Sequence, residues 1–177
     1  MMKKMLSAIL AMAMILSLST CAMAATGLGS VTTVSANAAG EKDGSVSVNT
    51  TLCAVSLDAE GKITSITFDI VQSKATFDAN GALLSEESAA PQSKRELKDS
   101  YGMKAASAIG KEWYEQMDAL EAWCIGKTVE EVLNMPLFDR GDGRHNAVPD
   151  DVDLKSSCTV SIGDQLKSLE KASAAAR

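Results

Sequence analysis

Residues 45–71 read SVSVNTTLCAVSLDAEGKITSITFDIV, and this stretch decides the fold class. Val, Ile and Thr recur at alternate positions on both sides of Asp58-Ala59-Glu60-Gly61, which has the residue types of a tight turn. Alternation of period two around a turn predicts an antiparallel β-hairpin, with one strand over 45–57 and its partner over 62–71.

Two further features refine this sheet. The alternation slips between Ile63 and Ile66, which indicates a β-bulge or a change of face there. A second turn, Asp78-Ala79-Asn80-Gly81, contains the Asn-Gly pair that favours a two-residue hairpin loop. The short stretches on either side of it, 76–77 and 82–84, are predicted to pair with each other.

The rest of the chain has the pattern of helices. A charged stretch over 85–100 reads as a solvated connector, and apolar residues at three- and four-residue spacing then predict a helix over 104–125. Thr128 and Glu131 form a capping-box pattern for a short helix, and a last helix follows residue 161. The predicted fold class is therefore α+β: an antiparallel sheet in the N-terminal half, then helices, with a C-terminal helix after Thr159.

The N-terminus resembles an export signal. Lys3 and Lys4 precede an apolar run over 5–18, and small residues lead up to a cleavage position after Ala24. Cleavage there defines residues 1–24 as a signal peptide and 25–177 as a single domain. An alternative processing, acylation of Cys21, would make a lipoprotein and give the protein a membrane anchor. Both alternatives predict an extracytoplasmic location, either secreted or at the cell surface.

Charge and composition exclude several function classes. The chain of 177 residues has a formal net charge of −6, and removal of the two lysines of the signal peptide takes it to −8. This acidic balance, without a basic stripe, disfavours nucleic acid as a partner. His145 is the single histidine. A multi-histidine metal centre is therefore excluded, and a hydrolase is the weakest hypothesis.

The segment Ser156-Ser157-Cys158-Thr159-Val160-Ser161 places hydroxyls and small side chains directly before a predicted helix. Backbone amides at a helix N-terminus bind anions and phosphates. A purely structural alternative is that Ser161 and Asp164 form a capping box for that helix.

This segment resembles the flavinylation motif of the FMN-binding domain family, found in exported bacterial redox proteins and in a subunit of sodium-pumping quinone reductases. In that family the motif is Ser-Gly-Ala-Thr-x-Ser, and a flavin transferase attaches FMN to the Thr through a phosphoester bond. The resemblance assigns Ser156 to the first Ser, Ser157 and Cys158 to the Gly and Ala positions, Thr159 to the modified Thr, and Ser161 to the last Ser. It therefore implies a covalent FMN on Thr159, with the neighbouring residues around its phosphate.

The resemblance extends to other parts of the chain. Gly61-Lys62-Ile63 matches a hairpin turn of the family. The opening departs from the family, whose glycine-rich opening with an aromatic residue is reduced here to Gly27-Leu28-Gly29. An attached isoalloxazine ring needs an apolar or aromatic wall. Trp113 falls on the apolar stripe of its helix and is expected in the core, whereas Trp123 lies beside that stripe and is the better candidate for a cofactor contact.

The cysteines and a group of acidic residues are the remaining candidates for functional residues. Three cysteines follow the signal peptide, Cys53, Cys124 and Cys158, and an odd number leaves at least one thiol without an intramolecular partner. Cys53 and Cys124 are expected to pack as small hydrophobic residues. The Asp-rich loop over 139–153 lacks the spacing of a calcium loop and reads as a solvated acidic segment.

Two hypotheses about function follow. The first is an exported electron carrier with FMN on Thr159, which exchanges electrons with redox partner proteins and uses no catalytic acid or base of its own. The second is a secreted or surface-anchored binding protein that keeps the fold without flavin.

Overall fold

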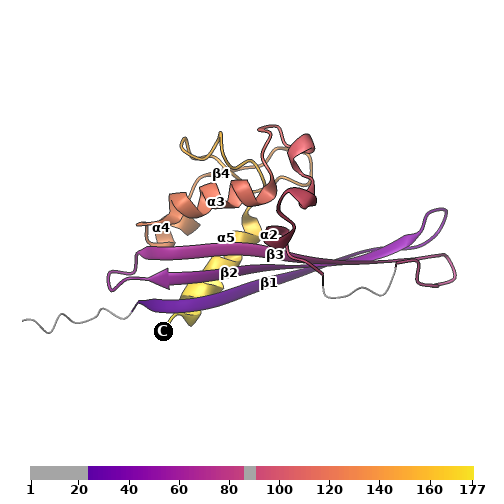
Figure 1. Cartoon of the computed structure of the whole chain (residues 1–177), viewed down its shortest axis with the longest axis horizontal. Helices are drawn as coiled ribbons and strands as arrows, with labels where there is room; N and C mark the ends of the chain where they lie inside the picture. The colour runs from indigo at the N-terminus through magenta and orange to yellow at the C-terminus, as the bar shows by residue number, and fades with distance from the viewer. Residues whose placement is uncertain (1–23, 86–90) are drawn as a thin grey trace, which may run out of the picture.

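The computed structural model describes residues 24–85 and 91–177. The predicted signal peptide lies outside these residues apart from Ala24. Three long strands, β1 (Ala25–Asn37), β2 (Gly44–Leu57) and β3 (Ile63–Phe77), form an antiparallel sheet in the order β1-β2-β3. The predicted hairpin is β2 and β3, so the antiparallel sheet in the N-terminal half is confirmed (Figure 1).

Local sequence explains the turn of this hairpin and the bulge beside it. The carboxylate of Asp58 accepts the backbone N–H groups of Glu60 and Lys62 at 3.0 and 2.8 Å, and Gly61 has a φ of +78°. An Asx turn closed by a left-handed Gly is what the residue types predicted. The predicted irregularity is also present, since Ser56 pairs with Ser65 while Leu57 pairs with Ile63. One residue of β3 is therefore extra at the bulge.

The second predicted hairpin is much shorter than the first. Asp78 repeats the turn of Asp58, with its carboxylate accepting the N–H groups of Asn80 and Ala82. The pairing after the turn is limited to a bridge between Phe77 and Leu83, and no strand forms over 82–84.

The helical part begins with short elements and ends with a long helix. It contains α2 (Lys94–Leu97), the 3-10 turns η1 (Lys98–Tyr101) and η2 (Lys104–Ala106), α3 (Trp113–Cys124), α4 (Val129–Leu133), the two-residue strands β4 (Leu137–Phe138) and β5 (Val148–Pro149), and α5 (Gly163–Ala175). The expected order of sheet followed by helices, with a C-terminal helix after Thr159, is confirmed.

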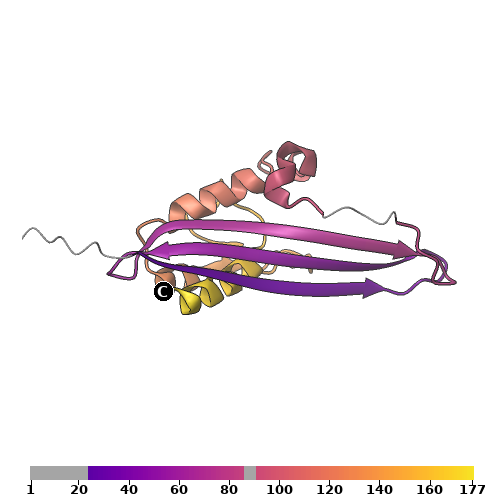
Figure 2. The same ribbon diagram turned by 60° about the horizontal axis from the view of Figure 1, so that its bottom comes forward.

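Helices α3 and α5 cover one face of the sheet (Figures 1 and 2). Gly29, Cys53 and Phe68 are cross-strand neighbours, and all three are buried on that face. The adjacent row of the sheet points the other way: Leu28 is 67% exposed, and its neighbour Ala54 is exposed as well. The strand ends that lead to the turns after β1 and β3 extend past the helices.

Gly27 and Gly29 let α5 lie unusually close to β1. A Cβ on Gly29 would be 2.1 Å from the backbone oxygen of Ser168, and one on Gly27 would be 1.9 Å from that of Ala172. Lys171 on the same helix donates to the backbone oxygen of Ser30 at 2.9 Å. Glycine is required here because any side chain would push the helix away from the strand.

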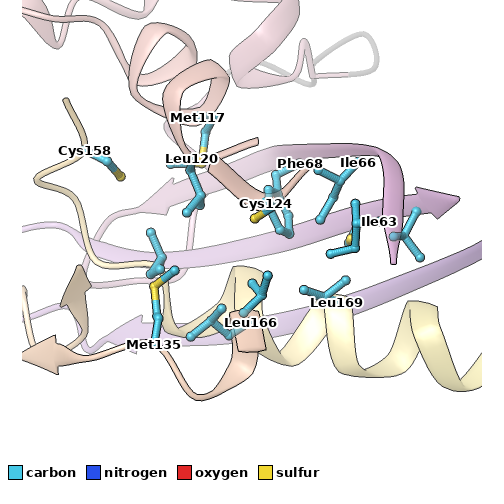
Figure 3. Close-up of a cluster of buried hydrophobic side chains, with 14 of the residues drawn as sticks. Ile63, Ile66, Phe68, Met117, Leu120, Cys124, Met135, Cys158, Leu166 and Leu169 are labelled. Atoms are coloured by element: carbon cyan, nitrogen blue, oxygen red, sulfur yellow. The ribbon is translucent and has the colours of Figure 1, made fainter. Parts of the chain in front are cut away.

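The core fills the space between the sheet and the helices (Figure 3). It takes side chains from β2, β3, α3, α4 and α5, of which the fully or almost fully buried ones include Cys53, Ile63, Phe68, Met117, Leu120, Cys124, Val132 and Leu169. Burial of each large apolar side chain stabilises the fold by about 1.5–3 kcal/mol.

One expectation about the helical region is wrong. The helix predicted over 104–125 begins only at Trp113, because Gly110 adopts a φ of +62° and buried Glu112 accepts the N–H groups of Met103 and Lys104. The described part of the charged connector, 91–100, is mostly exposed, but it also forms α2 and η1.

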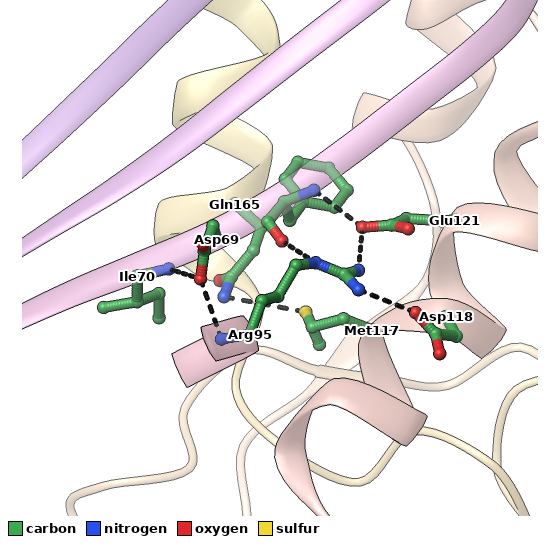
Figure 4. Close-up of polar contacts among 8 residues, drawn as sticks. Asp69, Ile70, Arg95, Met117, Asp118, Glu121 and Gln165 are labelled. Atoms are coloured by element: carbon green, nitrogen blue, oxygen red, sulfur yellow. Dashed lines mark hydrogen bonds and ion pairs between the residues drawn. The ribbon is translucent and has the colours of Figure 1, made fainter. Parts of the chain in front are cut away.

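Within that connector, the guanidinium of Arg95 links α2 to β3 and α3. It donates to the backbone oxygen of Phe68 at 2.6 Å and pairs with Asp118 and Glu121 at 2.8 and 2.5 Å (Figure 4). Charged residues in this stretch therefore make tertiary contacts that their spacing in the sequence does not indicate.

Candidate functional site

The Thr159 segment forms a turn that leads into α5. The backbone oxygen of Leu154 accepts the N–H groups of Ser157 and Cys158, and the Cys158 side chain is fully buried. Helix α5 then begins with Ile162 as its N-cap, and that cap makes no side-chain hydrogen bond. The alternative of a Ser161–Asp164 capping box is therefore wrong, and the Ser161 hydroxyl lies 3.2 Å from Asn146 Oδ1 instead.

Thr159 is held by a residue of α3. The side-chain oxygen of Gln116 accepts the backbone N–H of Thr159 at 2.8 Å and its hydroxyl at 3.3 Å. Gln116 is fully buried, and its amide nitrogen donates to Ser107 Oγ and to the backbone oxygen of Lys111. Every polar atom of this side chain is thereby paired, so the amide is fixed in orientation.

A second contact comes from the loop between β4 and β5. Arg140 Nη2 donates to the backbone oxygen of Thr159 at 2.8 Å. The loop itself is closed by Asp142, which accepts the N–H groups of Arg144 and His145 and contacts His145 Nδ1 at 2.6 Å. These hydrogen bonds lower the pKa of Asp142 to about 2. Thr159 is thus held by its own backbone while its hydroxyl faces Gln116.

Three cavities surround the segment. Thr159 lines one of about 280 Å³ together with Phe138 and Pro149, and another of about 210 Å³ together with Gln116 and Arg140. A larger cavity of about 480 Å³ shares Met103, His145 and Val160 with the one of 210 Å³. Thr159 therefore lines two smaller cavities, and the one of 210 Å³ borders the large cavity through these three shared residues.

The large cavity is lined mostly by polar side chains and has a basic rim. Met103, Ile70 and buried Trp113 supply its apolar part, and Ser161 and Gly163 also line it. Three basic side chains also line it, against the single carboxylate of Asp164: Lys94, Arg144 and Lys167. In an acidic chain, this local excess of positive charge favours an anionic ligand.

Lys94 is the basic residue that lies against the aromatic wall. Its ammonium is 4.6 Å from the ring centroid of Tyr101 and 5.1 Å from that of Trp113. Burial lowers the pKa of Lys94 to about 8, although the nearby charge of Asp69 acts in the opposite direction. The ammonium is therefore partly removed from water and kept next to π faces that attract it.

Some of the predicted site residues line these cavities, and others lie away from them. Ser156 is exposed, and the Ser157 hydroxyl lies 3.3 Å from the backbone oxygen of Leu154, to which it donates. Trp123 lies near the C-terminal end of α3, about 15 Å along the helix axis from Trp113. There its ring holds the ammonium of Lys127 at 4.1 Å. The structure thus brings Trp113 to the large cavity and places Trp123 at the opposite end of the helix.

Sequence reasoning did not assign Gln116, Arg140 or Lys94 to the site. Gln116 gives a weak signal, since an amide on an otherwise apolar helix stripe needs a buried partner. Arg140 and Lys94 give none, because the contacts that bring them to the cavity are tertiary.

The three cysteines of the domain are free and buried. Burial raises the pKa of each thiol, Cys53, Cys124 and Cys158, to about 12. The expectation that Cys53 and Cys124 pack as small hydrophobic residues is confirmed. Cys158 packs in the same core and is fully buried, and it lines the cavity of about 280 Å³ together with Thr159.

The described residues contain neither a metal-binding cluster nor a membrane-spanning helix. No group of three or more His, Cys, Asp or Glu side chains in 24–85 and 91–177 is arranged to hold a metal ion. Over the same residues, no helix is long and apolar enough to span a membrane.

Comparison with known proteins gives one informative similarity. A chlorophenol reductase from Desulfitobacterium hafniense is 36% identical over 117 residues. The match covers 60% of this chain and 36% of the reductase, so the chain spans little more than a third of that protein. No family model matches the chain, and no solved structure matches it.

Proposed function

We propose that this chain is an extracytoplasmic electron carrier that holds FMN on the hydroxyl of Thr159. The observation that carries the proposal is the position of Thr159, which lines a cavity of about 210 Å³ that shares Met103, His145 and Val160 with a larger cavity with a basic rim. A cavity of about 480 Å³ is within the range of small-molecule sites in proteins.

The residues around the cavity fit the parts of FMN. Arg144 and Lys167 offer positive charge on the rim for a phosphate ester, and Lys167 already pairs with Asp164 at 3.0 Å. Met103 and Ile70, beside buried Trp113, offer an apolar surface of the kind that an isoalloxazine ring requires. Bound FMN would supply the one- and two-electron chemistry, and the chain would contribute orientation and electrostatics.

Gln116 and Arg140 have a defined role in this proposal. Their hydrogen bonds fix the backbone of Thr159 on both sides of its Cα. The Gln116 oxygen also accepts the hydroxyl hydrogen, which esterification would remove, so the two backbone contacts would hold Thr159 after modification. The similarity to a protein named as a reductase is consistent with a redox role.

The test is the intact mass of the protein purified from its native host, with peptide mapping across Thr159. We expect an FMN-sized addition on the fragment that contains Thr159, and none in Thr159→Val, which keeps the shape and removes the hydroxyl. Unmodified Thr159 in a host that flavinylates other exported proteins would refute the proposal. The same spectrum distinguishes cleavage after Ala24 from acylation at Cys21.

An alternative function is binding without flavin, and the uncovered face of the sheet favours it. Leu28 and Val34 of β1 are 67% and 68% exposed, on strands whose far ends extend beyond the helices (Figure 2). Apolar side chains exposed on the same face of an uncovered sheet could contribute to a partner-binding surface. A colourless, unmodified protein that binds a surface partner through β1 would support this second function.

A further inference from the structure

The large cavity contains basic residues of two kinds. Arg144 and Lys167 are exposed at its rim, whereas Lys94 is half-buried against Tyr101 and Trp113. The rim residues are suited to a phosphate that remains partly in water. The position of Lys94 suits a different charge, one that develops on an aromatic ring inside the cavity.

The backbone around Lys94 is unusually well fixed for such a short helix. Ser93, which is buried, and Glu96, which is exposed, form a reciprocal capping box. The adjacent Arg95 is tied to the Phe68 backbone and to Glu121, which anchors α2 on β3 and α3 (Figure 4). The Asp69 carboxylate accepts the N–H of Arg95 at 3.2 Å. The backbone that carries Lys94 at the edge of the cavity is therefore held by tertiary contacts and is not a free loop.

Reduction of a flavin creates the charge that this ammonium would meet. The ring accepts two electrons and one proton, and the product carries one more negative charge than the oxidised ring. A partly desolvated cation nearby stabilises that product more strongly than one in water, because the local dielectric constant is lower. The oxidised ring gains little from the same cation, so the reduction potential rises.

We propose that Lys94 is the residue that sets the reduction potential of this site, with its ammonium compensating the negative charge of the reduced isoalloxazine ring. The inference rests on the proposed attachment of FMN at Thr159. It predicts that the loss of the Lys94 charge disfavours the reduced form, while the attachment of FMN to Thr159 is unchanged.

The experiment compares the full chain with two variants, produced in a host that has the flavin transferase. Lys94→Met removes the charge and keeps the length of the side chain, and Lys94→Arg keeps the charge. Lys104→Met is the matched control, because Lys104 is exposed and does not line the large cavity. Intact mass first verifies FMN on each protein. Dithionite titration against a redox dye then gives each midpoint potential.

We expect the equilibrium constant for reduction to fall about tenfold in Lys94→Met, a decrease of about 30 mV for a two-electron couple. The midpoint potentials of Lys94→Arg and Lys104→Met should remain close to that of the protein without substitutions. An unchanged potential in flavinylated Lys94→Met would overturn this inference and leave the proposed function intact. Absence of FMN from every protein would overturn both. If Lys94→Met does not fold, Lys94→Gln provides the same comparison with a polar side chain.

Discussion

Gln116 of α3 and Thr159 of the segment before α5 are 43 residues apart in sequence and are joined by two hydrogen bonds to one buried amide oxygen. This contact connects the candidate modification site to the hydrophobic core. Because Gln116 sits on the same helix face as Met117 and Leu120, core packing and the position of Thr159 are coupled. Changes in the core should therefore affect the site.

The first prediction follows from this contact. Gln116→Met keeps the volume and leaves the Thr159 N–H without its partner, and an unsatisfied buried donor costs about 1–3 kcal/mol. We expect a loss of that size in the free energy of urea unfolding. If FMN is attached at Thr159, the flavinylated fraction measured by intact mass should also fall. Gln92→Met, at an exposed position, is the control and should change neither quantity.

The second prediction concerns the close approach of α5 to β1. Gly29→Ala places a methyl group 2.1 Å from the Ser168 oxygen, so helix and strand must separate. Such overpacking costs about 1–3 kcal/mol and sometimes more. Gly40→Ala is a matched control, because a Cβ there meets nothing within 4 Å. Thermal unfolding of the two variants should show a clear loss for the first and almost none for the second; equal effects would mean that α5 does not lie as described.

The sheet could be predicted from sequence because its signals are local. Asp58 and Gly61 form their turn with neighbours up to four residues away, and alternation in 45–57 reports which face is buried. The start of α3 could not be predicted in the same way. Apolar spacing continues through 104–112, but the left-handed Gly110 and the buried carboxylate of Glu112 break the helix.

The candidate site could be predicted only in part for the same physical reason. Thr159 stands in a contiguous motif, so its segment can be found in the sequence. Its partners Gln116 and Arg140, and the cavity residue Lys94, come from three other elements and meet only in the folded chain. Trp113 and Trp123 illustrate the limit: helical spacing indicates that they differ in position, but not which of them borders a cavity.

The third prediction concerns the thiols. With a pKa of about 12, each of Cys53, Cys124 and Cys158 is thiolate to about one part in ten thousand at pH 8. Ellman's reagent should therefore react very slowly with the folded protein that begins at Ala25. After unfolding in urea, the same protein should react at three thiols per chain. Fewer than three thiols in urea without reductant would reveal a disulfide and contradict the free cysteines of this structure.

The last prediction concerns the pair of Arg95 and Glu121, which holds α2 against α3. Burial raises the pKa of Glu121, while hydrogen bonds from the Phe68 N–H and from Arg95 act against that rise. In Arg95→Met the carboxylate loses its cation, so its pKa should rise further. Loss of one partner of a buried pair costs about 3–5 kcal/mol. We expect about 2 kcal/mol at pH 7 here, because the Arg95 side chain is 24% exposed.

The pH dependence gives this prediction its sign. A carboxyl whose pKa is higher in the folded than in the unfolded state binds protons preferentially when folded, so its contribution to stability improves as the pH falls. The deficit of Arg95→Met should therefore shrink between pH 7 and pH 5 in urea titrations. Glu121→Gln removes the titrating group, and in the double variant the deficit due to Arg95→Met should be smaller and independent of pH. A deficit that stays constant with pH in the single variant would mean that Arg95 stabilises α2 through its bonds to Phe68 and Asp118 and not through Glu121.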